Sequence, residues 1–208
     1  FDEARAVEVG HPQPGGSHEQ VHVPLDAALH ERQMYIAIKA VDNAGNQSPM
    51  ASLKATVPPA QLVFSDDFDQ AGDMWTADSP WSRVEEPGRG LVWTDSPDGQ
   101  YGNDLQVGLT SNPIDLRGCE DPVLSFDSRY DLEDGYDYVN VQIKEEGADS
   151  WEQLTRLNGS DGWRSHDIDL SSYTGKDIQL RFELESDGSV QKDGFYLDNL
   201  KIVGAPTE

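Results

Sequence analysis

His18, Glu19 and His22 form the pattern His-Glu-x-x-His, with which a helix presents two zinc ligands and a general base. The chemistry needs a helix, because residues four apart then share one face and lie about 6 Å apart. Here two glycines precede the motif, and apolar and polar residues alternate from residue 19 to residue 25, which predicts a strand. Residues four apart on a strand lie about 13 Å apart and cannot share one metal ion. We therefore expect exposed strand histidines.

Other catalytic patterns are missing from the sequence. It contains no Gly-x-Ser-x-Gly elbow for a serine nucleophile and no phosphate-binding loop. The lone cysteine, Cys119, precedes Glu120 and Asp121 in a segment that resembles a turn, and neighbouring acids raise the pKa of a thiol. We therefore expect an inert loop thiol and no catalysis by this chain.

Carboxylates are the chemical groups that the chain has in excess. Its 208 residues include 39 Asp and Glu against 15 Lys and Arg, a formal net charge of −24. Such a field repels nucleic acid and anionic lipid. The sequence also lacks a run of about 18 apolar residues that could cross a membrane. We expect no nucleic-acid partner and no membrane insertion, and cations become the natural ligands.

Two acidic clusters have the composition of a calcium site. Ca²⁺ takes six to eight oxygens from carboxylates and turn carbonyls. Residues 66–69 include Asp66, Asp67 and Asp69, and a second cluster of acids spans residues 131–137. Neither cluster matches an EF-hand loop. The sequence alone leaves open whether these acids bind calcium or are solvated turn residues.

Short β-rich segments predict an all-β chain. The expected strands span residues 34–41, 51–57, 62–64, 91–94, 123–129, 138–144, 151–157, 164–169, 178–184 and 195–203. Glycine-containing turns such as Asn158-Gly159 and Asp187-Gly188 separate many of them. Regular short strands without a long helical period indicate two-sheet antiparallel sandwiches.

Charge and proline divide the chain into two modules. Residues 1–60 carry 7 acidic and 4 basic side chains, whereas residues 61–208 carry 32 and 11. Pro58 and Pro59 cannot continue a helix or donate to a sheet, so they predict a stiff linker. We place domains at residues 1–57 and 62–204, with a linker at 58–61 and a tail at 205–208.

The run from Tyr35 to Pro49, with the turn Asp42-Asn43-Ala44-Gly45-Asn46, resembles the last hairpin of a fibronectin type III domain. The variant it resembles follows catalytic domains in secreted bacterial proteases. Residues 1–57 are too few for a complete domain of this kind. The resemblance therefore implies a partial fibronectin type III sandwich, completed by the remainder of a parent chain or by a separate chain.

Residues 64–203 carry a longer series of motifs, among them Asp66-Asp67-Phe68-Asp69, Leu124-Ser125-Phe126, Tyr136-Asp137-Tyr138, Leu180-Arg181-Phe182 and Gly194-Phe195-Tyr196-Leu197-Asp198-Asn199. The series resembles the MAM-like jelly-roll module of secreted bacterial peptidases of the immune inhibitor A and bacillopeptidase F type. The resemblance implies a jelly-roll β-sandwich with structural calcium. It also implies that the first and last strands meet, so that Asp67 and Asp198 become calcium ligands, with Asp66 as a further candidate.

The resemblance implies a non-catalytic C-terminal accessory region of a larger secreted bacterial peptidase. Such a region would bind substrate or a surface with calcium as a stabiliser, position the catalytic domain, and act outside the cell. The alternative is an adhesion or glycan-binding module of a cell-surface protein. The five tryptophans, Trp75, Trp81, Trp93, Trp151 and Trp163, suit either function, because Trp stacks on sugars but also fills cores. We expect core packing for them.

Overall fold

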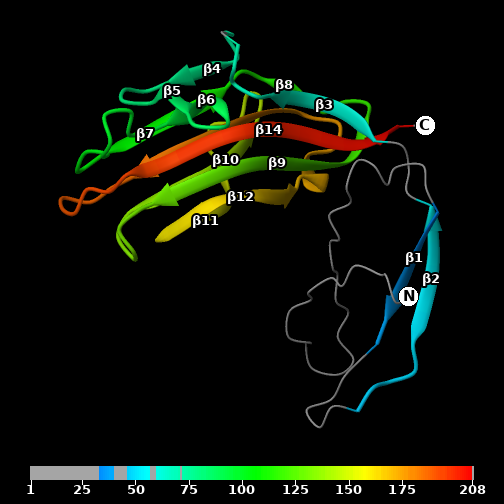
Figure 1. Cartoon of the computed structure of the whole chain (residues 1–208). Coiled ribbons are helices and arrows are strands. Elements are labelled where there is room, and N and C mark those ends of the chain that lie inside the picture. Colours follow the sequence, from blue (N-terminus) through cyan, green and yellow to red (C-terminus); the bar gives the residue numbers. More distant parts are fainter. Residues whose placement is uncertain (1–32, 40–45, 57–59, 71, 208) are drawn as a thin grey trace. The chain divides into compact units, whose positions relative to one another are not determined.

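A computed structural model describes residues 33–39, 46–56, 60–70 and 72–207 (Figure 1). It divides into two compact units, Phe1–Pro58 and Pro59–Glu208. The His18–His22 motif, the expected strand at residues 19–25 and most of the turn at residues 42–46 lie outside the described residues. The two units are therefore considered separately, and the predicted domain assignments stay predictions.

In the first unit, one antiparallel hairpin is described. Strand β1 (Gln33–Ile38) pairs with β2 (Ala51–Thr56), and Ile36 lies opposite Leu53. β1 overlaps the β-rich segment expected at residues 34–41, and β2 lies within the segment expected at residues 51–57. The fibronectin type III identity of this unit stays a prediction.

The second unit contains two six-stranded sheets. One sheet has the order β11-β10-β13-β7-β4, with β8 beside β13, and the other has the order β12-β9-β14-β6-β5, with β3 beside β14. The strands are β3 (Gln61–Asp66), β4 (Trp75–Ala77), β5 (Ser82–Glu86), β6 (Gly90–Thr94), β7 (Gln106–Ser111), β8 (Ile114–Asp115), β9 (Cys119–Asp131), β10 (Tyr138–Glu145), β11 (Glu152–Leu157), β12 (Ser160–Asp169), β13 (Asp177–Glu185) and β14 (Gly194–Pro206). All pairs are antiparallel. The all-β class and the two-sheet sandwich are confirmed.

Alternation along the strands builds the core between the sheets. On β13, Ile178, Leu180, Phe182 and Leu184 are fully buried, and polar side chains alternate with them. Phe182 meets Phe126 of β9 edge to face, with ring centroids 5.2 Å apart. Each sheet therefore turns one face to the core and the other toward solvent.

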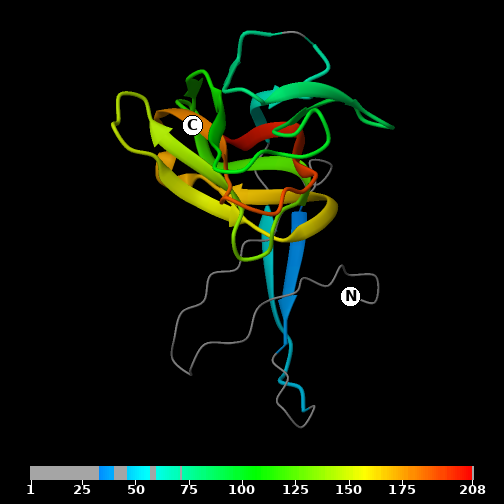
Figure 2. The ribbon, with the colours of Figure 1, turned by 90° about the vertical axis from the view of Figure 1, so that its left-hand side faces the viewer.

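Strand β14 lies in the middle of its sheet, between β9 and β6, and it also pairs with β3 (Figure 1). The loop that precedes β14 faces the viewer in Figure 2. A single 3₁₀ turn, Ser171–Tyr173, is the helical element among the described residues, and none of those residues forms a helix long and apolar enough to cross a membrane.

Candidate functional site

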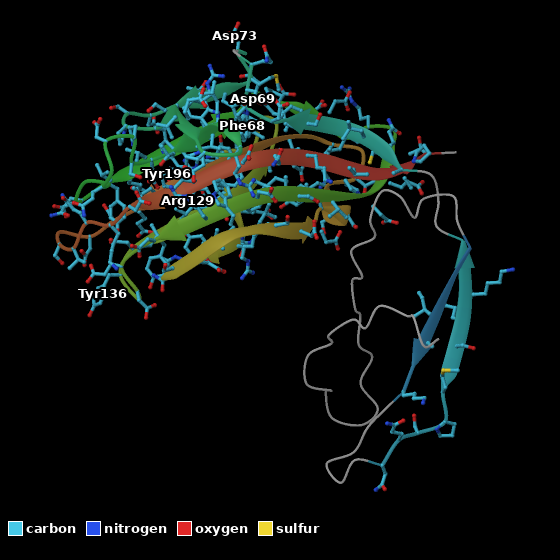
Figure 3. All side chains as sticks on the ribbon, in the orientation of Figure 1. Phe68, Asp69, Asp73, Arg129, Tyr136 and Tyr196 are labelled. Carbon is cyan, nitrogen blue, oxygen red and sulfur yellow. The ribbon has the colours of Figure 1, made fainter. Side chains whose placement is uncertain are left out.

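Three connections of the sandwich meet at one end, which we call the loop end: residues 95–105, 132–137 and 186–193. Backbone hydrogen bonds join the first connection to the third, from Tyr101 N to Lys192 O at 3.1 Å and from Asp104 N to Asp187 O at 2.8 Å. The second connection is joined to the first by a hydrogen bond from Glu133 N to the Tyr101 hydroxyl at 3.1 Å. The exposed side chain of Tyr136, labelled in Figure 3, lies in the second connection. Side chains from segments far apart in sequence are thus brought together here.

Glu133, Asp137 and Asp187 form a group of three carboxylates at the loop end. Each offers one oxygen, and these oxygens lie within 4.8 Å of one another. Asp137 is completely buried, while Glu133 and Asp187 are half-buried. Within the described part of the chain, no other group of three or more potential metal ligands is this close.

Neutral donors hold this group in place. The hydroxyl of Tyr101 donates to Asp137 Oδ2 at 2.6 Å and accepts from Glu133 N at 3.1 Å. The backbone N–H of Asp187 donates to Asp137 Oδ1 at 2.8 Å. The side-chain amide of Asn158 donates to the carbonyl oxygens of Glu133 and Asp137, at 3.0 and 2.7 Å. The geometry is therefore fixed without a Lys or Arg partner.

The three carboxylates carry negative charge that only the more distant Lys192 partly offsets, at Glu133. No ion pair in the described ranges involves any of them. Burial, and then the charges of Asp187 and Asp137, raise the pKa of the Glu133 carboxyl. The Oε2 atom of Glu133 is buried and has no hydrogen-bond partner. Three carboxylate oxygens this close together, with a further Glu133 oxygen that lacks a hydrogen-bond donor, suit a hard cation such as Ca²⁺.

The sequence-predicted ligands lie elsewhere, where β3 meets β14. Asp66 lies opposite Leu200, but its two oxygens accept hydrogen bonds from Phe68 N at 2.8 Å and Trp75 Nε1 at 2.9 Å. The Oδ1 atom of Asp67 accepts a hydrogen bond from Asp69 N at 3.3 Å. Protein donors therefore occupy both oxygens of Asp66, whereas the exposed Asp67 accepts this one bond at a single oxygen.

Asp198 is only 2% exposed and already has a cation beside it. Its Oδ2 lies 2.9 Å from Nη1 of Arg89, which also lies 3.0 Å from Asp127. The backbone N–H of Asn199 donates to Asp198 Oδ1 at 2.8 Å. The calcium role of Asp66, Asp67 and Asp198 stays a prediction.

Sequence reasoning found part of the loop end and missed the rest. The acidic segment 131–137 was a calcium candidate, and it contains Glu133 and Asp137. Asp187 was interpreted only as the first residue of an Asp-Gly turn, and nothing local distinguishes Tyr101 as the residue that holds the group. Asp187 and Tyr101 reach the carboxylate group only through pairing between segments that are far apart in the sequence.

Cys119 was expected to be an inert thiol in a loop, and its predicted location in a loop was wrong. Cys119 is the first residue of β9 and is fully buried. Burial raises the pKa of its thiol, and Asp121 adds to the shift. The acidic residues after Cys119 suggested a turn, but this segment pairs with β14, where Pro206 lies opposite Cys119. The pairing extends β9 back to Cys119.

The tryptophans divide into two groups. Trp81 is buried, and Trp75 and Trp93 pack against the core, as expected. Trp151 and Trp163 are also partly buried, but among the described residues they do not belong to the side chains that pack against the core. Arg89 is 3.9 Å from the ring centroid of Trp163, and Lys144 and Arg181 are 4.9 and 4.6 Å from that of Trp151. Core packing was therefore the wrong expectation for these two.

Comparison with known proteins gives relatives among peptidases, although no family model matches the chain. The chain is 33% identical to Bacillopeptidase F of Bacillus subtilis (strain 168) over 159 residues, which cover 71% of this chain and 11% of that protein. It is 27% identical to Pre-pro-metalloprotease PrtV of Vibrio cholerae, covering 49% of this chain and 12% of PrtV. It is also 27% identical to Immune inhibitor A of Bacillus thuringiensis subsp. alesti, covering 49% of this chain and 16% of that relative.

Among solved structures, the K3 cleaved adhesin domain of Lys-gingipain from Porphyromonas gingivalis w83 aligns with a TM-score of 0.50 and 11% identity, covering 70% of this chain and all of that domain. That likeness shows a shared fold. The chain spans less than a fifth of the length of the curated relatives that it matches. It is homologous to accessory regions of larger bacterial peptidases.

Proposed function

We propose that this chain is a non-catalytic accessory region of a larger peptidase that acts outside a bacterial cell. It binds protein substrate or a surface there and positions the catalytic domain. The observation that carries the proposal is the alignment: most of this chain matches 11% of Bacillopeptidase F.

One pair of side chains could suggest catalysis, and its burial argues against that role. Ser128 Oγ lies 2.8 Å from His166 Nε2, within the reach of a serine nucleophile and its base. Ser128 is 0% exposed, however, and His166 stacks on Phe126 with ring centroids 4.8 Å apart. A substrate carbonyl cannot reach this hydroxyl, so the pair supports a structural role.

Calcium is the second part of the proposal. The loop end supports it, because Glu133, Asp137 and Asp187 present oxygens within 4.8 Å and lack an ion-pair partner in the described part of the chain. Calcium there would tie three connections together and stiffen this end of the sandwich. Asp67 and Asp198, with Asp66, are the competing site, and binding there would have to displace Arg89 from Asp198.

An adhesion or glycan-binding role is the alternative function. The partly buried Trp151 favours it, because its ring lies beside Lys144 and Arg181, which extend from β10 and β13. An aromatic ring beside charged hydrogen-bond donors suits a sugar. Retardation of the chain in a polysaccharide-containing native gel, lost in Trp151→Ala and kept in Trp81→Phe, would favour this alternative.

The test of the main proposal uses the parent peptidase with and without residues 59–208. We expect the truncated enzyme to cleave a short peptide with unchanged kcat/KM, because its catalytic domain is intact. Its KM for casein should rise several-fold, because the accessory contacts are gone. Equal kinetics on casein, or casein hydrolysis by the purified 208-residue chain alone, would overturn the proposal.

A further inference from the structure

Asp95, directly after β6, is a buried acid that plays no part in the proposed calcium site. Its side chain is 0% exposed. The Oδ1 atom accepts a hydrogen bond from Phe195 N, in β14, at 3.1 Å. The Oδ2 atom is buried and has no hydrogen-bond partner, a state that it shares among the described residues only with Glu133 Oε2. Hydrogen bonds from Phe195 N and Ser96 favour the charged form, but they leave one oxygen of a fully buried carboxylate without a donor.

The backbone of β14 closes tightly around this side chain. Gly194 has φ +85°, and a Cβ atom there would collide with Asp95 Oδ1 and with Ser96 Oγ. Ser96 Oγ in turn donates to the carbonyl oxygen of Asp193. The start of β14 therefore lies directly on the Asp95 carboxyl, and water is excluded from it.

The charged groups around Asp95 do not compensate a negative charge. Asp193 faces it from the connection before β14 and disfavours its ionisation. Arg129, on β9, is held by Asp193 at 2.7 Å and by Glu86 at 3.2 Å, and it lies over the ring of Tyr196 (Figure 3).

Two further groups complete these surroundings. Tyr101 faces Asp95 from the loop end, and its hydroxyl proton is donated to Asp137. Lys192 pairs with Asp131, at 3.3 Å. Burial, with Asp193 as a smaller cause, raises the pKa of Asp95 to about 7.

We propose that Asp95 is a proton-dependent latch between β6 and the start of β14. With the proton on, the carboxyl is neutral and the two strand ends stay packed together. Loss of the proton to solvent leaves a buried negative charge beside Asp193, and the start of β14 loosens with the connection at residues 186–193.

The sign of the pH effect follows from linkage. Burial raises the pKa of Asp95 to about 7 in the folded chain, from the ordinary aspartate value of 3.8. The folded state therefore binds the proton more tightly than the unfolded state does. The stabilisation is complete below the unfolded pKa and is lost as the pH rises through the folded pKa. The latch thus holds in acid and releases near neutrality.

Urea unfolding of the full 208-residue chain in EDTA, followed by tryptophan fluorescence, tests the latch. Asp95→Asn keeps the shape and removes the ionisation, and Asp98→Asn is the matched control at an exposed acid in the same connection. Between about pH 5 and pH 7, the unfolding equilibrium constant of the wild type should rise up to about tenfold per pH unit relative to Asp95→Asn. Asp98→Asn should follow the wild type. Parallel pH dependence of the wild type and Asp95→Asn would overturn the proposal.

A second measurement decides the matter if Asp95→Asn fails to fold. Carboxyl carbon-13 NMR of the aspartate-labelled wild type follows each Asp directly. We expect the Asp95 resonance to titrate near neutral pH. An Asp95 resonance that titrates below about pH 5, the ordinary range of an aspartate, would overturn the latch.

Discussion

Nη1 of Arg89 lies 2.9 Å from Oδ2 of Asp198, a carboxylate that is 2% exposed. The guanidinium group is anchored a second time, because it lies over the ring of Trp163. The turn between β5 and β6 therefore brings a cation to the middle of the sheet. The resemblance to the MAM-like module implies a calcium ion beside Asp198, and in the structure the guanidinium group of Arg89 lies there.

Removal of that cation should destabilise the protein. Arg89→Met leaves Asp198 buried without its partner, which we expect to lower the free energy of unfolding by about 2–3 kcal/mol. Urea denaturation measures the change, and Arg164→Met at the exposed Asp161 pair is the control, with an expected loss below about 1 kcal/mol. Adding Asp198→Asn to Arg89→Met should recover part of the loss. Equal effects of the two arginine variants would contradict this account.

Gly194 should tolerate no side chain. Gly194→Ala adds a Cβ atom at φ +85° in contact with Asp95, whereas Gly147→Ala meets nothing within 4 Å at φ +83°. The control should cost about 1–2 kcal/mol for its backbone conformation alone. We expect Gly194→Ala to cost several times more or to prevent folding, as judged by thermal melting. Similar melting temperatures for the two variants would show that the packing around Asp95 is not close.

Tyr101→Phe should weaken the loop end. The change removes the donor to Asp137 and the acceptor of Glu133 N, and unsatisfied buried groups cost about 1–3 kcal/mol. In EDTA, we expect the melting temperature to fall by a few degrees. Tyr136→Phe, at a side chain that is 62% exposed, should leave it unchanged. A larger fall in melting temperature for Tyr136→Phe than for Tyr101→Phe would contradict the role of Tyr101 in holding the loop end together.

His166 should contribute a pH dependence opposite in sign to that of Asp95. Burial lowers the pKa of His166 below the ordinary histidine value of 6.5, and Arg164 adds to the shift. The unfolded chain therefore takes up the proton first, so stability should fall as the pH drops below about 6.5. Urea unfolding should show a smaller loss between neutral and mildly acidic pH in His166→Gln than in the wild type. Identical losses would mean that His166 is protonated equally in both states.

Strands that carry a strong apolar alternation were predicted from sequence, and weakly patterned strands were not. β10 and β13 appear within one residue of the expected ranges, because alternate residues of each face the core. β7 (Gln106–Ser111) was missed because Gly108 interrupts it, and β5 (Ser82–Glu86) because it is polar and lies at an edge of its sheet. Pairing with a neighbour, which no local pattern contains, makes these segments strands.

The candidate site shows the same division. The acids of segment 131–137 are visible in the sequence, whereas Asp187 joins them through a hydrogen bond between loops 50 residues apart. The same long-range pairing places Arg89 beside Asp198, 109 residues away. Composition therefore indicated a cation site, and topology determines which carboxylates lack a protein partner.

Calcium binding at the loop end is tested most directly by thermal melts of the 208-residue chain in EDTA and in millimolar calcium. The wild type should gain several degrees in a saturable way, since an ion that binds only the folded state stabilises it, and sodium at matched ionic strength should not reproduce the shift. Glu133→Gln with Asp187→Asn should abolish the gain, and Asp67→Asn with Asp198→Asn should keep it. Loss of the gain only in the second double variant would move the site to the sequence-predicted ligands. Coincident wild-type melts with and without calcium would contradict the calcium-stabilised module altogether.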